Sequence, residues 1–516
     1  MQVSSQQSPQ DAASQDRFPV APTAAGGDGH VDRGGLVASL AAMVGEAHVS
    51  TDPDTLAWAS WDALDAYRSF GRPPAAAPVL AVVQPGTAAE VAAILAWATE
   101  AGVPIVPRGA GTGVMGGAIP LRPAVVLDLT RLDDVLVHRE DMRIEAGAGA
   151  TLARVAAAAA REGLLFAHDP WSLSMATVGG AIATNGMGYL FGPYGKMGDQ
   201  VLGLEVALPD GTVMRTRPTL SGGPGPMLHK LFAGAEGVLG VITRAWLRAW
   251  PAPEARRFGS FRFPTFAAGF AAVTALFRLG LVPAVMDLFD SAADEIEPQA
   301  DPHAAPGKGA PVRSAPAADR EVSVLHLGFF GFREGVEASW QRAVRELLAR
   351  GGEPLGSGPA QAYWDQRYDV AEGYRRDVQE PRDWRSRPWR FRGFEYLNVE
   401  LPLSQVLRYR EACLEHLAQY PELRAGETGL WGRPEIFSLI IHDVDGGPAG
   451  AAAMEAATDH LLRLVQDLGG TMEAIHGPGV KLQPLLRREW GAAYGVIKTI
   501  KAALDPAGIL HGQRWQ

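Results

Sequence analysis

Cysteine is almost absent from this sequence of 516 residues, which holds only Cys413. A single cysteine excludes an intramolecular disulfide, an iron–sulfur cluster held by the chain's own thiolates and a structural zinc site built on CxxC pairs. Cys413 stands among apolar residues in a predicted helix, which indicates a buried and unreactive thiol.

Long apolar runs and an excess of basic residues are also missing. Stretches such as residues 151–160 are rich in alanine and interrupted by charge, and none reaches the ~18 residues that cross a bilayer. The chain has 47 Lys and Arg against 57 Asp and Glu, a net charge of −10. The resulting pI of about 5.7 argues against a dedicated nucleic-acid binder. We therefore expect neither a membrane span nor a nucleic-acid partner.

The N-terminal residues 1–34 have neither the apolar core of a secretory signal nor the Arg-rich amphipathicity of a transit peptide. Their content of Ser, Gln, Ala, Gly and Asp is typical of a disordered tail. A second stretch, residues 291–320, is rich in Pro, Ala, Gly and Asp and predicts a mobile insertion. We expect a cytoplasmic protein.

Between these stretches, short β-type runs alternate with helical patterns in two successive regions. The first region has predicted strands at 79–83, 103–106 and 125–129 and predicted helices at 88–100 and 151–162. The second has strands near 258–263, 322–330, 394–401 and 436–442 and helices near 266–279, 336–350, 403–419 and 451–468. The pattern predicts an α+β protein with domains at 35–254 and 255–489, followed by a C-terminal segment at 490–516.

The most informative stretch is the glycine-rich loop at residues 107–117, which directly follows a predicted strand. Its glycines indicate a backbone that turns with positive φ and approaches a ligand closely. Successive N–H groups in such a turn form a nest for phosphate oxygens. Gly111, Gly113 and Gly116 match G-x-G-x-x-G, but prolines follow where a Rossmann helix would begin, so we reject the Rossmann interpretation and keep the phosphate one. A plain glycine-rich surface turn is the alternative.

Two further loops of small residues follow. The second loop, residues 169–188, combines minimal side chains with threonine hydroxyls, which suits close packing of a flat ring system. The third loop, residues 234–243, runs from a tight glycine turn into a strand. Each loop alone is a weak signal, and the three in this order are a stronger one.

Together the three loops resemble the FAD-binding domain of the vanillyl-alcohol oxidase and p-cresol methylhydroxylase (PCMH) superfamily. The likeness extends from about Pro78 to the C-terminus. It implies a two-domain fold, with a PCMH-type FAD-binding domain, an antiparallel-sheet cap domain for the substrate, and a last segment that returns to the FAD domain. In such proteins the first loop holds the FAD diphosphate, the second lines the flavin and ribityl chain, and the third lies against adenine and flavin.

Carried over to this sequence, the resemblance implies a set of cofactor contacts in the three loops and the last segment. They are Pro107, Arg108, Gly109, Ala110, Gly111, Thr112, Gly113, Pro170, Trp171, Ser174, Thr177, Gly180, Thr184, Asn185, Gly186, Met187, Glu236, Gly237, Val241, Ile242 and Arg514. Members that attach the flavin covalently use a His or a Cys, and the first loop carries neither, so we expect noncovalent FAD. We interpret His168, just before the second loop, as a solvated or capped loop histidine.

Catalytic candidates also follow from the resemblance. His476 stands where related enzymes place a histidine beside the flavin, and such a histidine can accept the proton of an alcohol while hydride leaves for flavin N5. Tyr374, Arg375 and Arg376 lie, with Tyr363 and Arg367, at positions typical of an Arg or Tyr that faces the flavin pocket. Arg375 or Arg376 would stabilise a substrate anion or the charge of a reduced flavin.

Each of these candidates has a plainer alternative. His476 could be a loop histidine that binds backbone carbonyls, and helical spacing alone would place several residues of 374–376 on a solvated face. The segment 384–392 interleaves arginines with tryptophans and could clamp a carboxylate or phenolate, or be a surface loop whose arginines pair with acidic residues.

Three branches of the superfamily resemble this chain. The D-lactate and glycolate branch typically has a Glu-His-Gly motif and a paired-histidine metal site, but here Ile475 replaces the Glu and only His442 stands upstream, so we expect no metal. The alkyl-dihydroxyacetonephosphate synthase branch matches the closing residues 509–514 but has consecutive histidines and a tyrosine that are missing here. The phenol-oxidising branch is similar at residues 192–195 and 203–211.

We therefore predict an FAD-dependent oxidoreductase, oxidase or dehydrogenase, that moves a hydride from the CH–OH carbon of a small anionic or aromatic substrate to flavin N5. A non-redox synthase of the ether-lipid type is one alternative, and a protein that binds FAD only structurally, as an interaction module, is another. The sequence leaves open whether oxygen reoxidises the flavin and whether the chain forms a homodimer.

Overall fold

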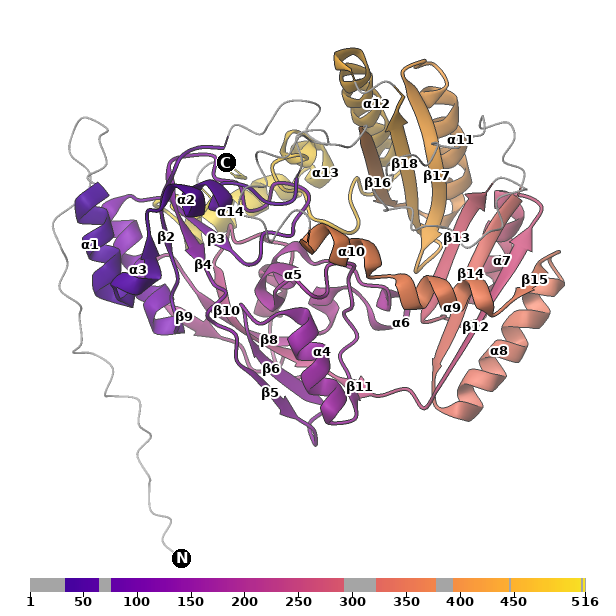
Figure 1. The fold of residues 1–516 in the computed structure, drawn as a ribbon, viewed down its shortest axis with the longest axis horizontal. Coiled ribbons are helices and arrows are strands. Elements are labelled where there is room, and N and C mark those ends of the chain that lie inside the picture. The colour runs from indigo at the N-terminus through magenta and orange to yellow at the C-terminus, as the bar shows by residue number, and fades with distance from the viewer. Residues whose placement is uncertain are drawn as a thin grey trace, which may run out of the picture.

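The computed structural model of this chain describes residues 33–64, 76–291, 322–376, 393–444, 447–511 and 514–515. The expected N-terminal tail and the insertion at 291–320 lie almost wholly outside these residues, and the segment 384–392 lies wholly outside them. The described part forms an N-terminal lobe, residues 33–254 with 493–515, and a cap lobe that begins at residue 255 (Figure 1).

The N-terminal lobe begins with a four-stranded sheet in the order β1 (Val49–Ser50), β2 (Val79–Val83), β4 (Ala124–Asp128) and β3 (Ile105–Arg108). Strands β2, β4 and β3 are parallel and almost wholly buried. Helix α3 (Ala88–Ala101) begins at Thr87, whose hydroxyl accepts the N–H of Glu90 at 3.1 Å, and ends at Gly102 with φ of 65°. Helix α3 and helix α1 (Arg33–Val44) pack in one apolar core with β2.

A second sheet of the same lobe is antiparallel. Its order is β5 (Val135–His138), β6 (Arg143–Gly147), β10 (Val241–Arg248), β8 (Val201–Ala207) and β9 (Val213–Arg215). The other elements are α2 (Pro53–Ala59), α4 (Leu152–Arg161), β7 (Leu164–Leu165), α5 (Val178–Thr184), α6 (Phe191–Tyr194) and β11 (Trp250–Pro251). Helix α5 packs on β10, so the second loop lies over this sheet.

The cap lobe is built on one antiparallel sheet of seven strands. Its order is β15 (Glu353–Gly356), β12 (Ala255–Phe263), β14 (Val322–Gly331), β13 (Val285–Ser291), β17 (Leu423–Trp431), β18 (Ile436–Asp443) and β16 (Phe394–Glu400). Four longer helices pack on it, α7 (Phe266–Arg278), α8 (Arg333–Leu348), α11 (Val406–Leu417) and α12 (Pro448–Asp467). Helix α9 (Gly358–Gln366) packs on β12, β14 and β15 of the cap, and α10 (Asp369–Tyr374) follows it toward the N-terminal lobe (Figure 1).

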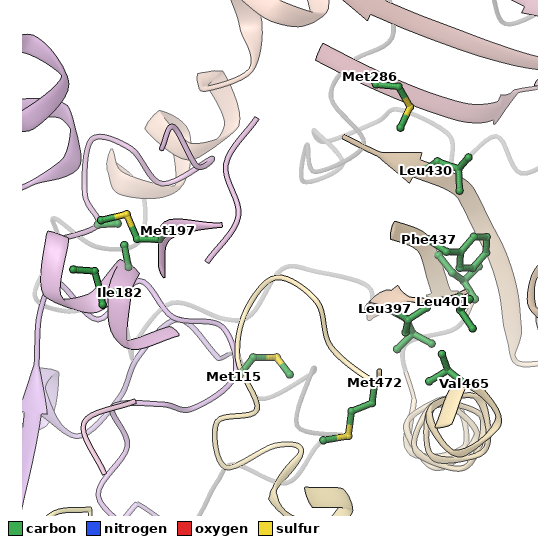
Figure 2. Packing of buried hydrophobic residues seen from close by; sticks show 14 of the residues in the cluster. Met115, Ile182, Met197, Met286, Leu397, Leu401, Leu430, Phe437, Val465 and Met472 are labelled. Carbon is green, nitrogen blue, oxygen red and sulfur yellow. The ribbon is translucent and has the colours of Figure 1, made fainter. Parts of the chain in front are cut away.

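Alternation along the cap strands separates a core face from a second face. Leu397 on β16 and Phe437 on β18 are buried in the core with Val465 of α12, as Figure 2 shows. Because successive side chains of a strand point to opposite faces, their neighbours Tyr396 and Ser438 line a cavity on the other side of the sheet. The free face of the sheet is therefore available to form a site.

The end of the chain returns to the N-terminal lobe after α13 (Leu486–Trp490) and α14 (Ala493–Leu504). Asp505 forms a buried ion pair with Lys501 and accepts the N–H of Leu510 at 2.9 Å. The N–H of His511 donates to the carbonyl of Ile105 at 3.0 Å, so the last segment extends the four-stranded sheet beside β3.

The described residues include the single cysteine and all the longer helices discussed above. Cys413 is buried in α11, as predicted, and burial raises the pKa of its thiol to about 12. None of the helices in the described part of the chain combines the length and apolar character that a bilayer crossing needs.

Candidate active site

A cavity of about 1420 Å³ is lined by residues of both lobes. It exceeds the ~300–1,000 Å³ of a typical small-molecule pocket, which leaves room for a large cofactor and a second ligand. The three glycine-rich loops line it from the N-terminal lobe, and the free face of the cap sheet with α9 and α10 lines it from the cap lobe.

Most of the expected cofactor contacts line this cavity. They are Pro107, Arg108, Gly109, Ala110, Gly111, Thr112, Gly113, Pro170, Trp171, Thr177, Gly180, Thr184, Gly186, Met187, Glu236, Gly237, Val241 and Ile242. Ser174, Asn185 and Arg514 are not among the lining residues. Asn185 instead ends α5 in the left-handed conformation, φ 51°, and its side-chain oxygen accepts the N–H of Gly198 at 2.9 Å.

The first and second loops meet so closely that only glycine fits between them. A Cβ atom on Gly109 would lie 2.2 Å from the Oγ1 of Thr177. Gly111 has φ of 68°, and a Cβ there would lie 2.1 Å from the guanidinium of Arg108. The bare backbone of this loop therefore faces the cavity, as a phosphate cradle requires.

Arg108 brings a positive charge to the same loop. Its side chain is buried, its guanidinium lies 4.2 Å from the ring centroid of Trp58, and it donates to the carbonyl of Trp61. Burial lowers its pKa, while Asp62 and Asp128 oppose that shift, and the guanidinium stays charged. Its Nε has no acceptor among the described residues, so Arg108 retains a donor.

Asp62 is a lining residue that the sequence analysis missed, because no motif surrounds it. Its carboxylate accepts the N–H of Leu64 at 3.0 Å and of Ala118 at 3.3 Å. Burial raises its pKa to about 6, against the opposing effects of these N–H groups and of Arg108. The first loop therefore carries a buried cation, Arg108, and is contacted by a buried acid, Asp62, at Ala118 just beyond its end.

The cavity fits the FAD that the resemblance implies. It offers a glycine cradle that a Cβ would fill and the charge of Arg108 beside that cradle. On the second loop, Trp171 also lines the cavity, and its indole N–H is buried without an acceptor among the described residues. The diphosphate of FAD would use the glycine cradle with Arg108, and its ring system would use the Trp171 N–H.

Arg514 supports the loops from outside the cavity. It is fully buried, forms an ion pair with Glu236, and donates to the carbonyl of Gly117 at 3.1 Å. Glu236 also accepts the N–H of Gly479 at 3.1 Å. The last segment, the third loop and the turn after His476 are thus joined at one carboxylate.

His476 lines the cavity from that turn. Its Nδ1 lies 3.4 Å from the Oε1 of Glu473, and the ring of Tyr396 packs edge-on at 5.6 Å. Glu473 accepts the N–H of Ile475 at 2.8 Å and of His476 at 3.0 Å. Burial alone would raise the pKa of Glu473, but His476 and these N–H groups lower it overall. A carboxylate is therefore held behind the histidine.

The structure does not bring all the expected catalytic residues to the cavity. Tyr374 lines it and packs on Trp171, with ring centroids 6.0 Å apart. Arg375 forms an ion pair with Glu372 at 2.9 Å, and neither Arg375 nor Arg376 is a lining residue.

Arg367 is the arginine that α9 and α10 bring to the cavity. Its guanidinium lies 3.6 Å from the ring centroid of Trp364 and 4.2 Å from that of Tyr368. Its Nε lies 3.5 Å from the carboxylate of Asp169. Burial raises the pKa of Asp169 to about 6, and Arg367 is the largest opposing influence.

The interpretation of His168 as a solvated loop histidine is wrong. The side chain is 1% exposed and lines the cavity, and burial lowers its pKa to about 3. The reason is that the second loop folds back over its own start, so that a Cβ on Gly186 would lie 3.8 Å from the His168 ring. His168 is therefore a neutral imidazole in the wall of the cavity.

The cap lobe contributes lining residues that the sequence analysis did not single out, among them Phe289, His326 and Trp431. Only His326 falls on a predicted strand, 322–330, and alternation along it does not say which face carries a site; Phe289 and Trp431 lie on β13 and β17, which the sequence analysis did not predict. In the described residues no group of three or more His, Cys, Asp or Glu side chains is placed to hold a metal ion.

Comparison with known proteins gives two family matches and several relatives. Residues 79–217 match the model of an FAD binding domain, and residues 252–512 match that of the C-terminal domain of FAD linked oxidases. The D-lactate dehydrogenase of Archaeoglobus fulgidus is 29% identical over 464 residues, which cover 87% of this chain and 94% of the relative. The glycolate oxidase subunit GlcD of Escherichia coli K12 is 28% identical over 494 residues, 93% of this chain and 91% of the relative.

Two solved structures share the fold. An alkyldihydroxyacetonephosphate synthase superposes with a TM-score of 0.72 at 19% identity, over 93% of this chain and 85% of its own. A p-cresol methylhydroxylase with substrate bound superposes with a TM-score of 0.71 at 18% identity, over 93% of this chain and 96% of its own. The predicted α+β fold, with its antiparallel-sheet cap, is confirmed.

Proposed function

The chain belongs to the family of FAD linked oxidases, and we propose that it oxidises a 2-hydroxy acid at the carbon that bears the hydroxyl group. It is an FAD-dependent oxidoreductase, as the sequence predicted. The relatives named D-lactate dehydrogenase and glycolate oxidase act on substrates in which a carboxylate adjoins a CH–OH carbon. Arg367 and His476 both line the cavity, and they would serve the substrate carboxylate and the substrate hydroxyl respectively.

The observation that carries the proposal is His476 on the cavity wall with Glu473 behind it. The carboxylate lies 3.4 Å from Nδ1, which favours the tautomer with the proton on Nδ1. Nε2 then carries the lone pair and takes the proton of the substrate hydroxyl. Bound FAD supplies the hydride acceptor, N5 of its ring system.

Arg367 is the residue that we propose to hold the substrate carboxylate, in place of Arg375 or Arg376. It lines the cavity, and its contacts with the rings of Trp364 and Tyr368 and its hydrogen bond to the carbonyl of Trp364 fix the guanidinium in place, so that its remaining N–H groups can donate to a carboxylate. Tyr374, beside Trp171, covers the end of the same wall.

The three loops are proposed to hold the cofactor without a covalent bond. The backbone of residues 109–113 with Arg108 would bind the diphosphate, residues 171–187 the flavin, and residues 236–242 the adenine side. We also propose the domain boundaries of the sequence analysis, a cytoplasmic location and a homodimer, and leave the electron acceptor as oxygen or another compound.

The test is the visible spectrum of the purified protein before and after acid precipitation, followed by anaerobic addition of both enantiomers of lactate, of glycolate and of longer 2-hydroxy acids. We expect yellow supernatant and bleaching of the flavin by at least one of these acids, and oxidised product equal to the flavin reduced. Flavin that stays in the pellet would contradict noncovalent binding. Flavin that no hydroxy acid bleaches, although dithionite reduces it, would contradict the proposed activity.

A further inference from the structure

Five aromatic side chains form a continuous wall on the cap side of the cavity. This aromatic wall consists of Tyr189, Phe289, His326, Tyr363 and Trp431, all of which line the cavity. Neighbouring ring centroids are 5.2 Å apart for Phe289 and His326, 5.3 Å for His326 and Tyr363, 6.2 Å for Tyr363 and Tyr189, and 5.5 Å for Tyr189 and Trp431. Four of the rings come from the cap lobe, on α9, β13, β14 and the end of β17. The fifth, Tyr189, comes from the N-terminal lobe, directly after the second loop.

The aromatic wall stands next to the catalytic candidate. Trp431 packs with Ile475, the neighbour of His476, against a buried apolar group that includes Met187 of the second loop. At its other side, the guanidinium of Arg367 lies 6.0 Å from the ring centroid of Tyr189. A ligand held between His476 and Arg367 would therefore meet the wall with the rest of its structure.

The five side chains of the wall hold no positive charge. His326 shares a hydrogen bond of 2.9 Å with Ser260, and burial lowers its pKa to about 4, so it is neutral near pH 7. Burial and the neighbouring Asp287 raise the pKa of Tyr363, so its hydroxyl keeps its proton.

An acidic residue, Asp287, adjoins the wall. Asp287 pairs in the sheet with His326 on one side and with Trp431 on the other, and it lines the cavity.

We propose that the preferred substrate is a 2-hydroxy acid with an aromatic ring as its side chain, and that the aromatic wall binds this ring. The inference rests on the proposed oxidation of a 2-hydroxy acid. The carboxylate is held at Arg367, the CH–OH group lies at His476, and the ring packs against Tyr189 and Trp431. Glycolate, lactate and 2-hydroxyglutarate carry no ring that could pack against this wall.

The experiment measures anaerobic flavin reduction in the holoenzyme with 3-phenyllactate, 3-cyclohexyllactate, lactate and 2-hydroxyglutarate. We expect the apparent second-order rate constant of 3-phenyllactate to exceed that of lactate at least about 10-fold, since each methylene in a matching apolar pocket already gives ~10–200-fold. Cyclohexyllactate should fall between them, and 2-hydroxyglutarate should be no better than lactate. Equal constants for 3-phenyllactate and lactate would overturn the proposal.

Trp431→Leu tests the wall itself. We expect it to lower the constant for 3-phenyllactate at least about 10-fold more than it lowers the constant for lactate, because only 3-phenyllactate carries a ring that reaches the wall. Trp340→Leu is the matched control, because Trp340 lies on α8 and packs against Phe261 without lining the cavity. If Trp431→Leu slowed both substrates equally, the ring would not be bound at this wall.

A binding measurement separates this inference from the proposed function. Phenylacetate and acetate cannot be oxidised at a CH–OH carbon, but each can perturb the flavin spectrum when it binds. A lower dissociation constant for phenylacetate than for acetate, with the difference lost in Trp431→Leu, supports ring binding at the wall. This result would stand even if no hydroxy acid bleached the flavin and the proposed oxidation failed. Equal affinity for the two acids would overturn the wall's role whatever is oxidised.

Discussion

Arg514 and Glu236, 278 positions apart in the sequence, form an ion pair in which neither side chain has appreciable contact with solvent. The pair connects the end of the chain to the third loop, and Arg514 also donates to Gly117, the last residue of the first loop. Two of the three loops that line the cavity are thus held by one arginine that does not line it.

Replacing this arginine should destabilise the protein and release its cofactor. Arg514→Met leaves the Glu236 carboxylate buried without its cation, and loss of one partner of a buried pair costs about 3–5 kcal/mol. We expect a lower midpoint of thermal unfolding and less FAD per chain after gel filtration. Arg463→Met is the control, since Arg463 pairs with Asp459 on the exposed surface of α12 and should cost about 1 kcal/mol or less. Equal effects of the two substitutions would contradict the importance of the buried pair.

The role of His476 predicts a loss of activity without a loss of cofactor. His476→Asn keeps a polar side chain but removes the proton acceptor, so flavin reduction should slow by about 10²–10⁴-fold. Glu473→Gln should slow it less, because the imidazole keeps its place but loses the carboxylate at Nδ1. Both variants should retain FAD, measured from the visible spectrum. Flavin reduction by His476→Asn at the parent rate would exclude the histidine as the base.

The sequence indicated which loops of the N-terminal lobe line the cavity but not which cap residues do, and the reason is physical. Residues 107–113 are a local signal, because the close approach of Thr177 selects glycine at 109 and a φ of 68° favours glycine at 111. Arg367 and Arg375 are only eight positions apart, and which of them reaches the cavity depends on the break between α9 and α10. His168 became buried because the second loop folds over it, a contact that composition does not encode.

Asp62 predicts that FAD affinity depends on pH. Burial raises the pKa of this carboxyl to about 6, so it is neutral below that pH and negative above it, beside the loop proposed to hold the diphosphate. FAD should therefore bind more tightly as pH falls through about 6 and more weakly as pH rises. Fluorescence titration of the apoprotein with FAD between pH 5 and 8 measures the slope. Asp62→Asn should remove this pH dependence of FAD affinity. Asp54→Asn, a substitution of an exposed residue of α2, should leave it unchanged.

The contact between Gly109 and Thr177 predicts that a single methyl group prevents assembly of the cofactor site. A Cβ at Gly109 would lie 2.2 Å from the threonine Oγ1, closer than any nonbonded contact, so Gly109→Ala must either displace this hydroxyl from the start of α5 or separate the first and second loops. We expect expression of a folded protein with little or no bound FAD, seen as a colourless preparation with an unchanged far-ultraviolet spectrum. Thr177→Ala in the same chain should restore part of the binding, because it removes the hydroxyl nearest the new methyl group.

Gly495→Ala is the control, since space around this residue of α14 is open and alanine there should stabilise the helix by up to about 1 kcal/mol. Full FAD content in Gly109→Ala would mean that the two loops can move apart without loss of the site.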